Sequence, residues 1–311
     1  MSSELRLKLP ATSANLGAAF DTAAVALDFY LEIEAEIAET FSIHATGRNA
    51  ELCAVLEDNL ILETYTALLA RHGKTVPHLK LTMHNGIPLG MGCGSSAAGR
   101  LAAVALAVHF GELGWTGEEI LAEACVQEGH PDNAAACWLG GFVAAACEGK
   151  TVHAAQVTPP KNWRALVVMP SYSLATSKAR AVLPGSYSRA DAVANIQAAS
   201  LLGLAFAQGR GDLLRPAMAD RIHQPYRGEI CTLLPRLLPL TGSDGILGVA
   251  LSGAGPSVLL IVDGDGSVEA AAAAVRKAIS GSEDSEEGIG AEIATTRFAE
   301  RGAGQELNIR N

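Results

Sequence analysis

The chain has 311 residues, 49% of them hydrophobic, and a formal net charge of −10 at pH 7. This length and apolar content allow a sizeable core and favour a globular chain of two domains. The acidic balance argues against nucleic acid as a partner, because phosphate backbones are bound by clustered Lys and Arg.

No segment is typical of a membrane span or a secretory leader. The longest purely apolar run of the helical region, 101–108, is far shorter than the roughly 20 residues that cross a bilayer. The N-terminus lacks a basic segment followed by an apolar one, and the cysteines form no C-x-x-C pair. We therefore expect a cytoplasmic protein with no membrane partner and no disulfide or zinc framework.

The first half of the chain alternates predicted strands and helices. Apolar residues that alternate with charged ones predict strands, and apolar residues at helical spacing after Asp58-Asn59 predict a helix. In chain order we expect strands at 5–9 and 31–37, a helix at 60–70, a strand at 79–83, helices near 95–110, 117–129 and 132–139, and a strand at 141–147.

Pro159-Pro160 is the best candidate for a linker, because paired prolines interrupt the hydrogen bonding of helices and sheets. The later elements are predicted as a strand at 164–169, several helices between about 176 and 239, strands at 246–252 and 256–262, a helix at 267–280 and a strand near 290–297. This order is typical of a split βαβ, ferredoxin-like domain. The acidic stretch 281–288 is expected to be a solvated loop.

A glycine-rich turn, P-L-G-M-G-C-G-S-S-A-A at 88–98, precedes the helix expected from residue 95. Gly90, Gly92 and Gly94 allow the backbone to approach a polyanion, while free N–H groups at the helix start favour phosphate. Ser95 and Ser96 fit as an N-cap, or as hydroxyl ligands to a phosphate or its metal. The turn alone leaves a phosphate site and a simple helix cap both open.

Two better-known phosphate motifs do not fit this turn. A P-loop would need Lys where Arg100 stands and Ser or Thr where Leu101 stands. The segment 92–97 matches a G-x-G-x-x-A dinucleotide fingerprint, but an amphipathic strand precedes it and Glu112 falls in a connection between helices. Both motifs are therefore rejected.

Three segments together resemble the motifs of the GHMP small-molecule kinases: P-A-T-S-A-N-L-G-A-A-F-D at 10–21, the glycine-rich turn, and L-S-G-A-G-P-S-V at 251–258. Within that family the chain is most similar to the homoserine kinases, and the similarity continues at 128–133, 176–180, 183–184 and 223–227. The resemblance implies an α+β GHMP kinase fold. It comprises an N-terminal, ATP-binding, ribosomal-S5-like α/β domain at 1–158 and a C-terminal ferredoxin-like α+β domain at 163–311.

The resemblance also implies an activity: transfer of the ATP γ-phosphate, with Mg²⁺, to the side-chain hydroxyl of L-homoserine in threonine biosynthesis. Members of the family are often homodimers, so a homodimer is expected. Phosphoryl transfer requires the protein mainly to align the two substrates and to neutralise phosphate charge.

Site residues follow by matching positions to the family. Ser96 and Glu128 match the magnesium ligands, as hard oxygen donors would, and Asn59 matches the adenine pocket, although it fits equally as the N-cap of the following helix. The resemblance places at ATP the residues Asn59, Pro88, Leu89, Gly90, Met91, Gly92, Cys93, Gly94, Ser95, Ser96, Ala97, Ala98 and Thr176.

The acceptor pocket is matched in the same way. Arg180 and Arg227 match the arginines that bind the substrate carboxylate, for which a planar guanidinium offers two parallel hydrogen bonds. The implied substrate-binding residues are Asn15, Asp21, His130, Asp132, Asn133, Arg180, Arg227 and Gly253, and the implied catalytic residues are Asn15, Asp21, Glu128 and Arg180.

Several alternatives stay open. Homoserine kinases are thought to lack a general base, so Asp21 and Asp132 are only the carboxylates to test for that role. The family usually has a glycine at the position of Ala19, a small residue at that of Met91 and a leucine at that of Cys93. These three differences bear on how tightly the chain binds a nucleotide. The competing hypotheses are a GHMP kinase that acts on mevalonate or a sugar, and a non-catalytic ATP-binding relative; the arginine pair favours an acceptor with a carboxylate.

Overall fold

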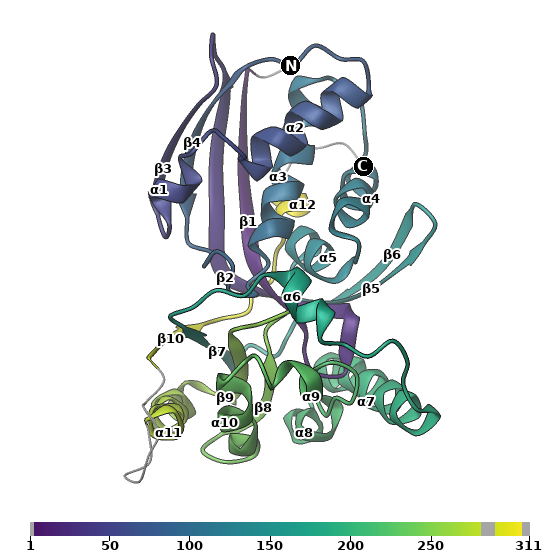
Figure 1. Ribbon diagram of the computed structural model, residues 1–311, viewed down its shortest axis with the longest axis vertical. Coiled ribbons are helices and arrows are strands. Elements are labelled where there is room, and N and C mark those ends of the chain that lie inside the picture. The colour runs from purple at the N-terminus through teal and green to yellow at the C-terminus, as the bar shows by residue number, and fades with distance from the viewer. Residues whose placement is uncertain (1–2, 281–289, 307–311) are drawn as a thin grey trace.

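The computed structural model describes residues 3–280 and 290–306, so the predicted acidic loop at 281–288 lies outside the described residues. It contains two sheets, one above the other in Figure 1. The first sheet has the order β3-β4-β2-β5-β6, with β1 also paired to β2. Its strands are β1 (Glu4–Asn15), β2 (Ala19–Ile37), β3 (Ser42–Gly47), β4 (Leu79–Asn85), β5 (Phe142–Glu148) and β6 (Thr151–Val157).

Helices cover one face of the first sheet (Figure 1). α3 (Ser95–Phe110) lies at their centre, and its residues from Ala97 to Val108 are buried except Arg100. The small side chains of this helix permit close contact with its neighbours α2, α4 and α5 and with β1. The other helices of this half are α1 (Ala50–Cys53), α2 (Leu60–Arg71), α4 (Gly117–Glu128) and α5 (Asp132–Leu139).

The second sheet has the order β10-β7-β9-β8. Its strands are β7 (Trp163–Pro170), β8 (Ile246–Leu251), β9 (Val258–Asp263) and β10 (Ala291–Thr296). With helices between β7 and β8 and again between β9 and β10, this is the split βαβ arrangement of a ferredoxin-like domain. The fold class predicted from the sequence is therefore confirmed.

The helices of this half lie mostly below the sheet in Figure 1. They are α6 (Thr176–Ala181), α7 (Arg189–Gln208), α8 (Leu214–Ala217), α9 (Gln224–Arg227), α10 (Leu233–Leu237) and α11 (Val268–Ile279), with 3₁₀ turns η1 (Gly211–Leu213), η2 (Leu238–Leu240) and η3 (Asp265–Ser267). By length and composition α7 could span a membrane, but helices on globular domains also pass that test.

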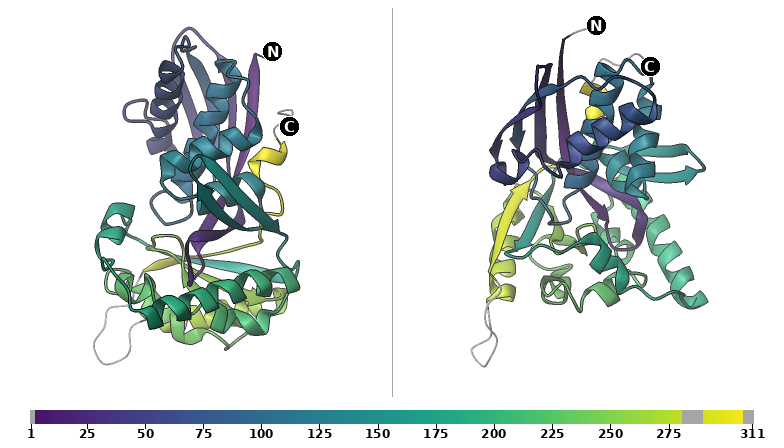
Figure 2. Two further views of the ribbon diagram at one scale, coloured as in Figure 1. Left: turned by 90° about the vertical axis from the view of Figure 1, so that its right-hand side faces the viewer. Right: turned by 45° about the horizontal axis from the view of Figure 1, so that its top comes forward.

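Two segments join the halves. The tip of the β1–β2 hairpin reaches into the second half, where His223 donates from Nε2 to the Gly17 carbonyl (2.8 Å) and Asn195 donates to the Ala18 carbonyl (2.6 Å). In the opposite direction, the end of the chain returns to the first half. α12 (Ala303–Glu306), yellow in Figure 2, contacts α5 and β1.

The returning segment is held by main-chain bonds. The Asp28 amide donates to the Arg297 carbonyl (3.0 Å), and the Gly141 amide donates to the Ala299 carbonyl (2.7 Å). The division at 158 and 163 stays a prediction, and the structure adds that residues 297–306 lie against the first sheet. The sequence offered no signal for this return, because each contact joins residues more than 150 positions apart.

Candidate active site

Three loops that are far apart in the sequence meet between the two halves. The Thr12 amide donates to the Cys93 carbonyl (3.1 Å), and the Gly253 amide donates to the Ala14 carbonyl (3.0 Å). The Ser252 hydroxyl donates to the Gly92 carbonyl (2.8 Å). The glycine-rich turn is therefore held from both sides, by the end of β1 and by the β8–β9 loop.

The glycines of the turn are required by its geometry. Gly90, Gly92 and Gly94 have φ values of 68°, 73° and 71°, in the region that L-residues with a side chain rarely adopt. A Cβ on Gly92 would lie 2.2 Å from the Ser252 carbonyl oxygen, and one on Gly94 would lie 1.9 Å from the Thr12 hydroxyl oxygen. A side chain at either position would force the loops apart.

One sequence interpretation predicted a serine N-cap for α3. The structure shows that this prediction is wrong. Gly94 is the N-cap, no side chain accepts a hydrogen bond there, and Ser95 and Ser96 are the first two helical residues. The first-turn N–H groups of this helix therefore lie uncapped beside a cavity, which is the arrangement that binds anions.

A cavity of about 450 Å³ opens beside this helix end. It brings together most of the residues predicted from the three motifs and from the segments around residues 130, 180 and 227. Among its lining residues are Asn15, Asp21, Gly90, Gly92, Gly94, Ser95, Ser96, Glu128, His130, Asp132, Asn133, Thr176, Arg180, Arg227 and Gly253.

The remaining predicted residues of the turn do not line this cavity. Pro88, Leu89 and Met91 line a separate hollow beside β10. Leu89 also lines the apolar cavity that contains Asn59. Cys93 is buried, and burial raises the pKa of its thiol to about 12. Ala97 and Ala98 are buried in the core of the first half, so they support the turn from behind.

A second, more apolar cavity of about 320 Å³ adjoins the first, because Ser95 and Ser96 line both. Asn59 lies at its wall and caps α2, its Oδ1 accepting from the amides of Ile61 (3.1 Å) and Leu62 (3.3 Å). The interpretation of Asn59 as an N-cap is therefore confirmed, and its assignment to an adenine pocket stays a prediction that its place in this cavity allows. Leu52, 65% exposed, also lines this cavity.

The side chains of Ser96 and Glu128 contact each other at the N-terminus of α3. The Ser96 hydroxyl donates to Glu128 Oε2 (3.0 Å), and Arg100 Nε donates to Glu128 Oε1 (2.6 Å). A hydroxyl and a carboxylate so close together are a donor set that suits a hard divalent cation such as Mg²⁺. The residues present therefore fit the metal that the sequence predicted.

Two arginines line the opposite part of the cavity. Arg180 binds both oxygens of Asp21, at 2.9 Å and 2.7 Å. Arg227 is 1% exposed and donates to the carbonyls of Ala179 (3.1 Å) and Gly253 (3.3 Å). Burial, with the nearby charge of Arg180, lowers the pKa of Arg227.

Sequence reasoning missed the residues that hold the two arginines in place. The Phe20 ring lies 5.5 Å from the Arg180 guanidinium and 5.3 Å from that of Arg227, so it lies within cation–π range of both. His223 must donate from Nε2 to the Gly17 carbonyl, so its Nδ1 accepts from Arg227 (3.2 Å). The motif segments at 10–21 and 223–227 contained both residues, but no pattern assigned them a role.

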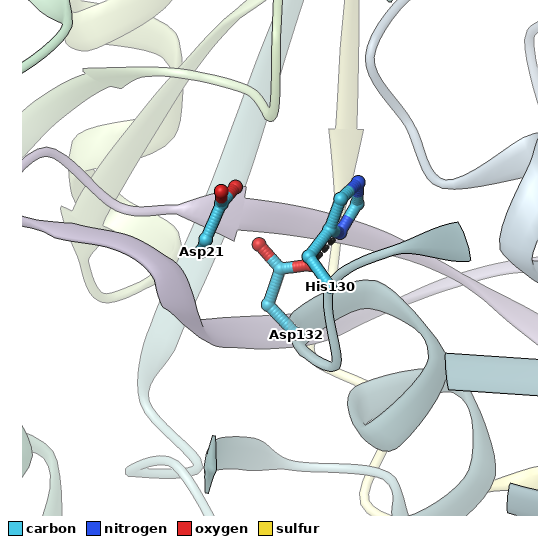
Figure 3. A group of neighbouring side chains, drawn as sticks. All are labelled: Asp21, His130 and Asp132. Atoms are coloured by element: carbon cyan, nitrogen blue, oxygen red, sulfur yellow. Dashed lines mark hydrogen bonds and ion pairs between the residues drawn. The ribbon is translucent and has the colours of Figure 1, made fainter. Parts of the chain in front are cut away.

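Asp21, His130 and Asp132 form a compact cluster beside these arginines (Figure 3). His130 Nδ1 donates to Asp132 Oδ1 (2.7 Å), and this bond raises the pKa of His130. Their ligand atoms lie within 4.8 Å of one another, a spacing that could hold a metal. Arg180 binds both Asp21 oxygens, so the cluster is a hydrogen-bonded part of the cavity wall.

Asn15 connects the β1–β2 hairpin to the third loop. Its Nδ2 donates to the Gly253 carbonyl (2.7 Å), and its Oδ1 accepts from the Asp21 amide (2.9 Å). Asn15 and Asp21 both have positive φ, 70° and 52°. Strained residues of this kind persist where the surroundings hold them in place, which is common at functional sites.

Two family profiles match the chain: "GHMP kinases N terminal domain" at 59–141 and "GHMP kinases C terminal" at 204–281. A homoserine kinase of Solibacter usitatus is 45% identical over 258 residues, 83% of this chain and 84% of that protein. A homoserine kinase of Carboxydothermus hydrogenoformans is 35% identical, over 97% of both chains. The chain belongs to the GHMP kinase family.

Solved structures agree with this fold. A homoserine kinase of Cytophaga hutchinsonii superposes with a TM-score of 0.80 at 23% identity, covering 97% of each chain. The mevalonate kinase of L. major gives a TM-score of 0.71 at 16% identity, covering 96% of this chain and 98% of that one. The family profiles and the homoserine kinase relatives show that this GHMP kinase is an ATP-dependent small-molecule kinase, as the sequence predicted.

One departure of this GHMP kinase from the family pattern has a simple structural account. Ala19 replaces a glycine of the first motif, but it begins β2 and is not among the described residues with positive φ. An alanine is therefore compatible with the backbone at this position. The left-handed conformations of the loop fall instead on Asn15, Leu16, Gly17 and Asp21.

Proposed function

We propose that this kinase phosphorylates the side-chain hydroxyl of L-homoserine to give O-phospho-L-homoserine, in threonine biosynthesis. The observation that carries the proposal is the arginine pair, Arg180 and Arg227, which lines the same cavity as the glycine-rich turn. An amino acid has a carboxylate, which guanidinium groups bind well. It also has an ammonium group, which can donate hydrogen bonds to the carboxylates of Asp21 and Asp132. The relatives named homoserine kinase support the same acceptor.

The nucleotide is proposed to lie across the two adjoining cavities. The apolar cavity beside Asn59 suits the adenine ring, and the glycine-rich turn with the α3 N-terminus suits the triphosphate. Thr176 lines the phosphate cavity from the second half. Ser96 and Glu128 would hold Mg²⁺, which supplies positive charge to the transferred phosphate when it is bound.

The reaction then depends on orientation of the acceptor hydroxyl. Asn15 and Asp21, joined by the Asn15 Oδ1 hydrogen bond, lie beside the arginine pair and would place that hydroxyl toward the phosphates. Both Asp21 oxygens accept from Arg180, and this favours a positioning role for Asp21 over a general base. His130, Asp132 and Asn133 would complete the amino acid pocket.

One assay tests the function against its alternatives. ADP release is measured with L-homoserine, L-serine, L-threonine, mevalonate and galactose side by side. We expect turnover with L-homoserine well above that with the other acceptors. Activity on mevalonate without activity on homoserine would replace the proposal by a mevalonate kinase, and ATP binding without any turnover would support a non-catalytic relative.

Arg180→Lys tests the carboxylate clamp. A lysine keeps the charge but loses the planar fork that binds Asp21 and a substrate carboxylate together. We expect the KM for homoserine to rise by about 10- to 100-fold, the factor of one lost charged hydrogen bond, with little change in ATP affinity. Arg221→Lys, at an exposed pair with Asp191 in the same half, is the control; equal KM values for the two variants would count against the clamp.

The cytoplasmic location and the homodimer stay predictions. Gel filtration with light scattering would measure the mass of the assembly directly.

A further inference from the structure

Arg100 lines the cavity, but the proposed reaction assigns it no role. It stands where a P-loop has its lysine, while Leu101 stands where a P-loop has Ser or Thr, so the segment is not a P-loop. In the structure Arg100 lies one helical turn after Ser96 in α3, and it lines the phosphate cavity together with Ser95 and Ser96. Long side chains on a helix lean toward its N-terminus, so that of Arg100 extends toward the glycine-rich turn.

The guanidinium of Arg100 is only partly engaged. Its Nε donates to Glu128 Oε1 (2.6 Å), and its Nη1 makes a long contact of 3.4 Å with the Gln127 side chain. Within residues 3–280 and 290–306, no hydrogen bond is found for its Nη2 amine, and the side chain is 28% exposed. Since a guanidinium has five N–H donors, several remain for a ligand in the cavity.

The charges around the cavity indicate what that ligand needs. The described lining residues contain three arginines, Arg100, Arg180 and Arg227, no lysine, and three carboxylates, Asp21, Asp132 and Glu128. Arg180 is bound by Asp21 and Arg227 is buried on the acceptor side. Arg100 is therefore the cation on the helix α3 side, where the proposed triphosphate would lie.

We propose that Arg100 is a phosphate-binding residue that contacts the terminal phosphates of ATP. It would supply from helix α3 the positive charge that a lysine supplies in a P-loop, and it would do so through the planar fork that suits phosphate oxygens. Only the Nε of Arg100 donates to Glu128, so the Nη2 amine can donate to phosphate oxygens while this largely buried ion pair, with side chains 28% and 8% exposed, stays in place. The inference rests on the proposed nucleotide site and is independent of the acceptor.

Nucleotide binding without metal tests this role. Affinities for ATP, ADP and AMP are measured by calorimetric titration in EDTA, so that metal binding by Glu128 cannot contribute, and repeated with magnesium. We expect Arg100→Gln to weaken ATP binding by about tenfold or more, ADP binding less, and AMP binding hardly at all, because the contact is to the terminal phosphates. Arg100→Lys should keep most of the ATP affinity, since it keeps the charge.

Arg71→Gln is the matched control. Arg71 also pairs with a glutamate of α4, Glu123 (2.7 Å), but it does not line the cavity; its variant should bind all three nucleotides as the wild type does. An unchanged ATP affinity in Arg100→Gln would overturn the proposal, and so would an equal loss for ATP, ADP and AMP, which would indicate a structural role. Failure of the wild-type chain to bind ATP in either buffer would instead contradict the proposed nucleotide site.

Discussion

Gly92→Ala is expected to weaken nucleotide binding by at least about tenfold and to lower the free energy of unfolding by about 2–5 kcal/mol. An alanine at φ 73° carries a backbone cost of about 1–2 kcal/mol. Its Cβ would also lie 2.2 Å from the Ser252 carbonyl oxygen and 2.8 Å from that of Gly255. Because both are backbone atoms, the third loop would have to move away from the glycine-rich turn. Urea unfolding and titration with a non-hydrolysable ATP analogue measure the two effects.

Gly114→Ala separates the steric effect from the backbone effect. Gly114 has a φ of 72°, nearly that of Gly92, but a Cβ there meets no heavy atom within 4 Å. We expect this variant to lose only about 1–2 kcal/mol and to bind the nucleotide normally. If Gly92→Ala bound nucleotide as tightly as Gly114→Ala, the close contact between the two loops would not be what shapes the phosphate site.

Glu128→Gln is expected to lower kcat by about 10²- to 10³-fold, the range found when one group that stabilises transition-state charge is removed. The amide keeps the shape of the side chain and an oxygen that can accept from Ser96, so the fold should persist. It loses the negative charge that a magnesium ligand supplies. Turnover measured over a range of magnesium concentrations should therefore also show a higher half-saturating concentration.

Glu123→Gln provides the control on the same helix. Glu123 pairs with Arg71 as Glu128 pairs with Arg100, but it lies outside the cavity. We expect its kcat and magnesium dependence to stay within about twofold of the wild type, because its carboxylate pairs with Arg71 and does not line the cavity. A Glu128→Gln enzyme with the same profile as Glu123→Gln would exclude Glu128 as a metal ligand.

Elements with one buried face could be predicted from the sequence. β4 alternates buried and exposed residues along its whole length, and the alternation of Leu79, Leu81 and Met83 with polar residues had predicted it. The first half of β2 was missed because its residues from Ala23 to Leu27 are all buried, so that no alternation marks the strand. β6 was missed for the opposite reason, since none of its residues is fully buried.

The sequence by itself determined the kinase family, the ferredoxin-like order of the second half and the glycine-rich turn before α3, because these depend on local periodicity and on short motifs. The tertiary structure alone decided which groups meet: Gly92 with Ser252, Arg180 with Asp21, and Arg100 with Glu128. The partners in these pairs lie 160, 159 and 28 residues apart. Such pairs form only when helices and sheets pack together, so no local sequence pattern predicts them.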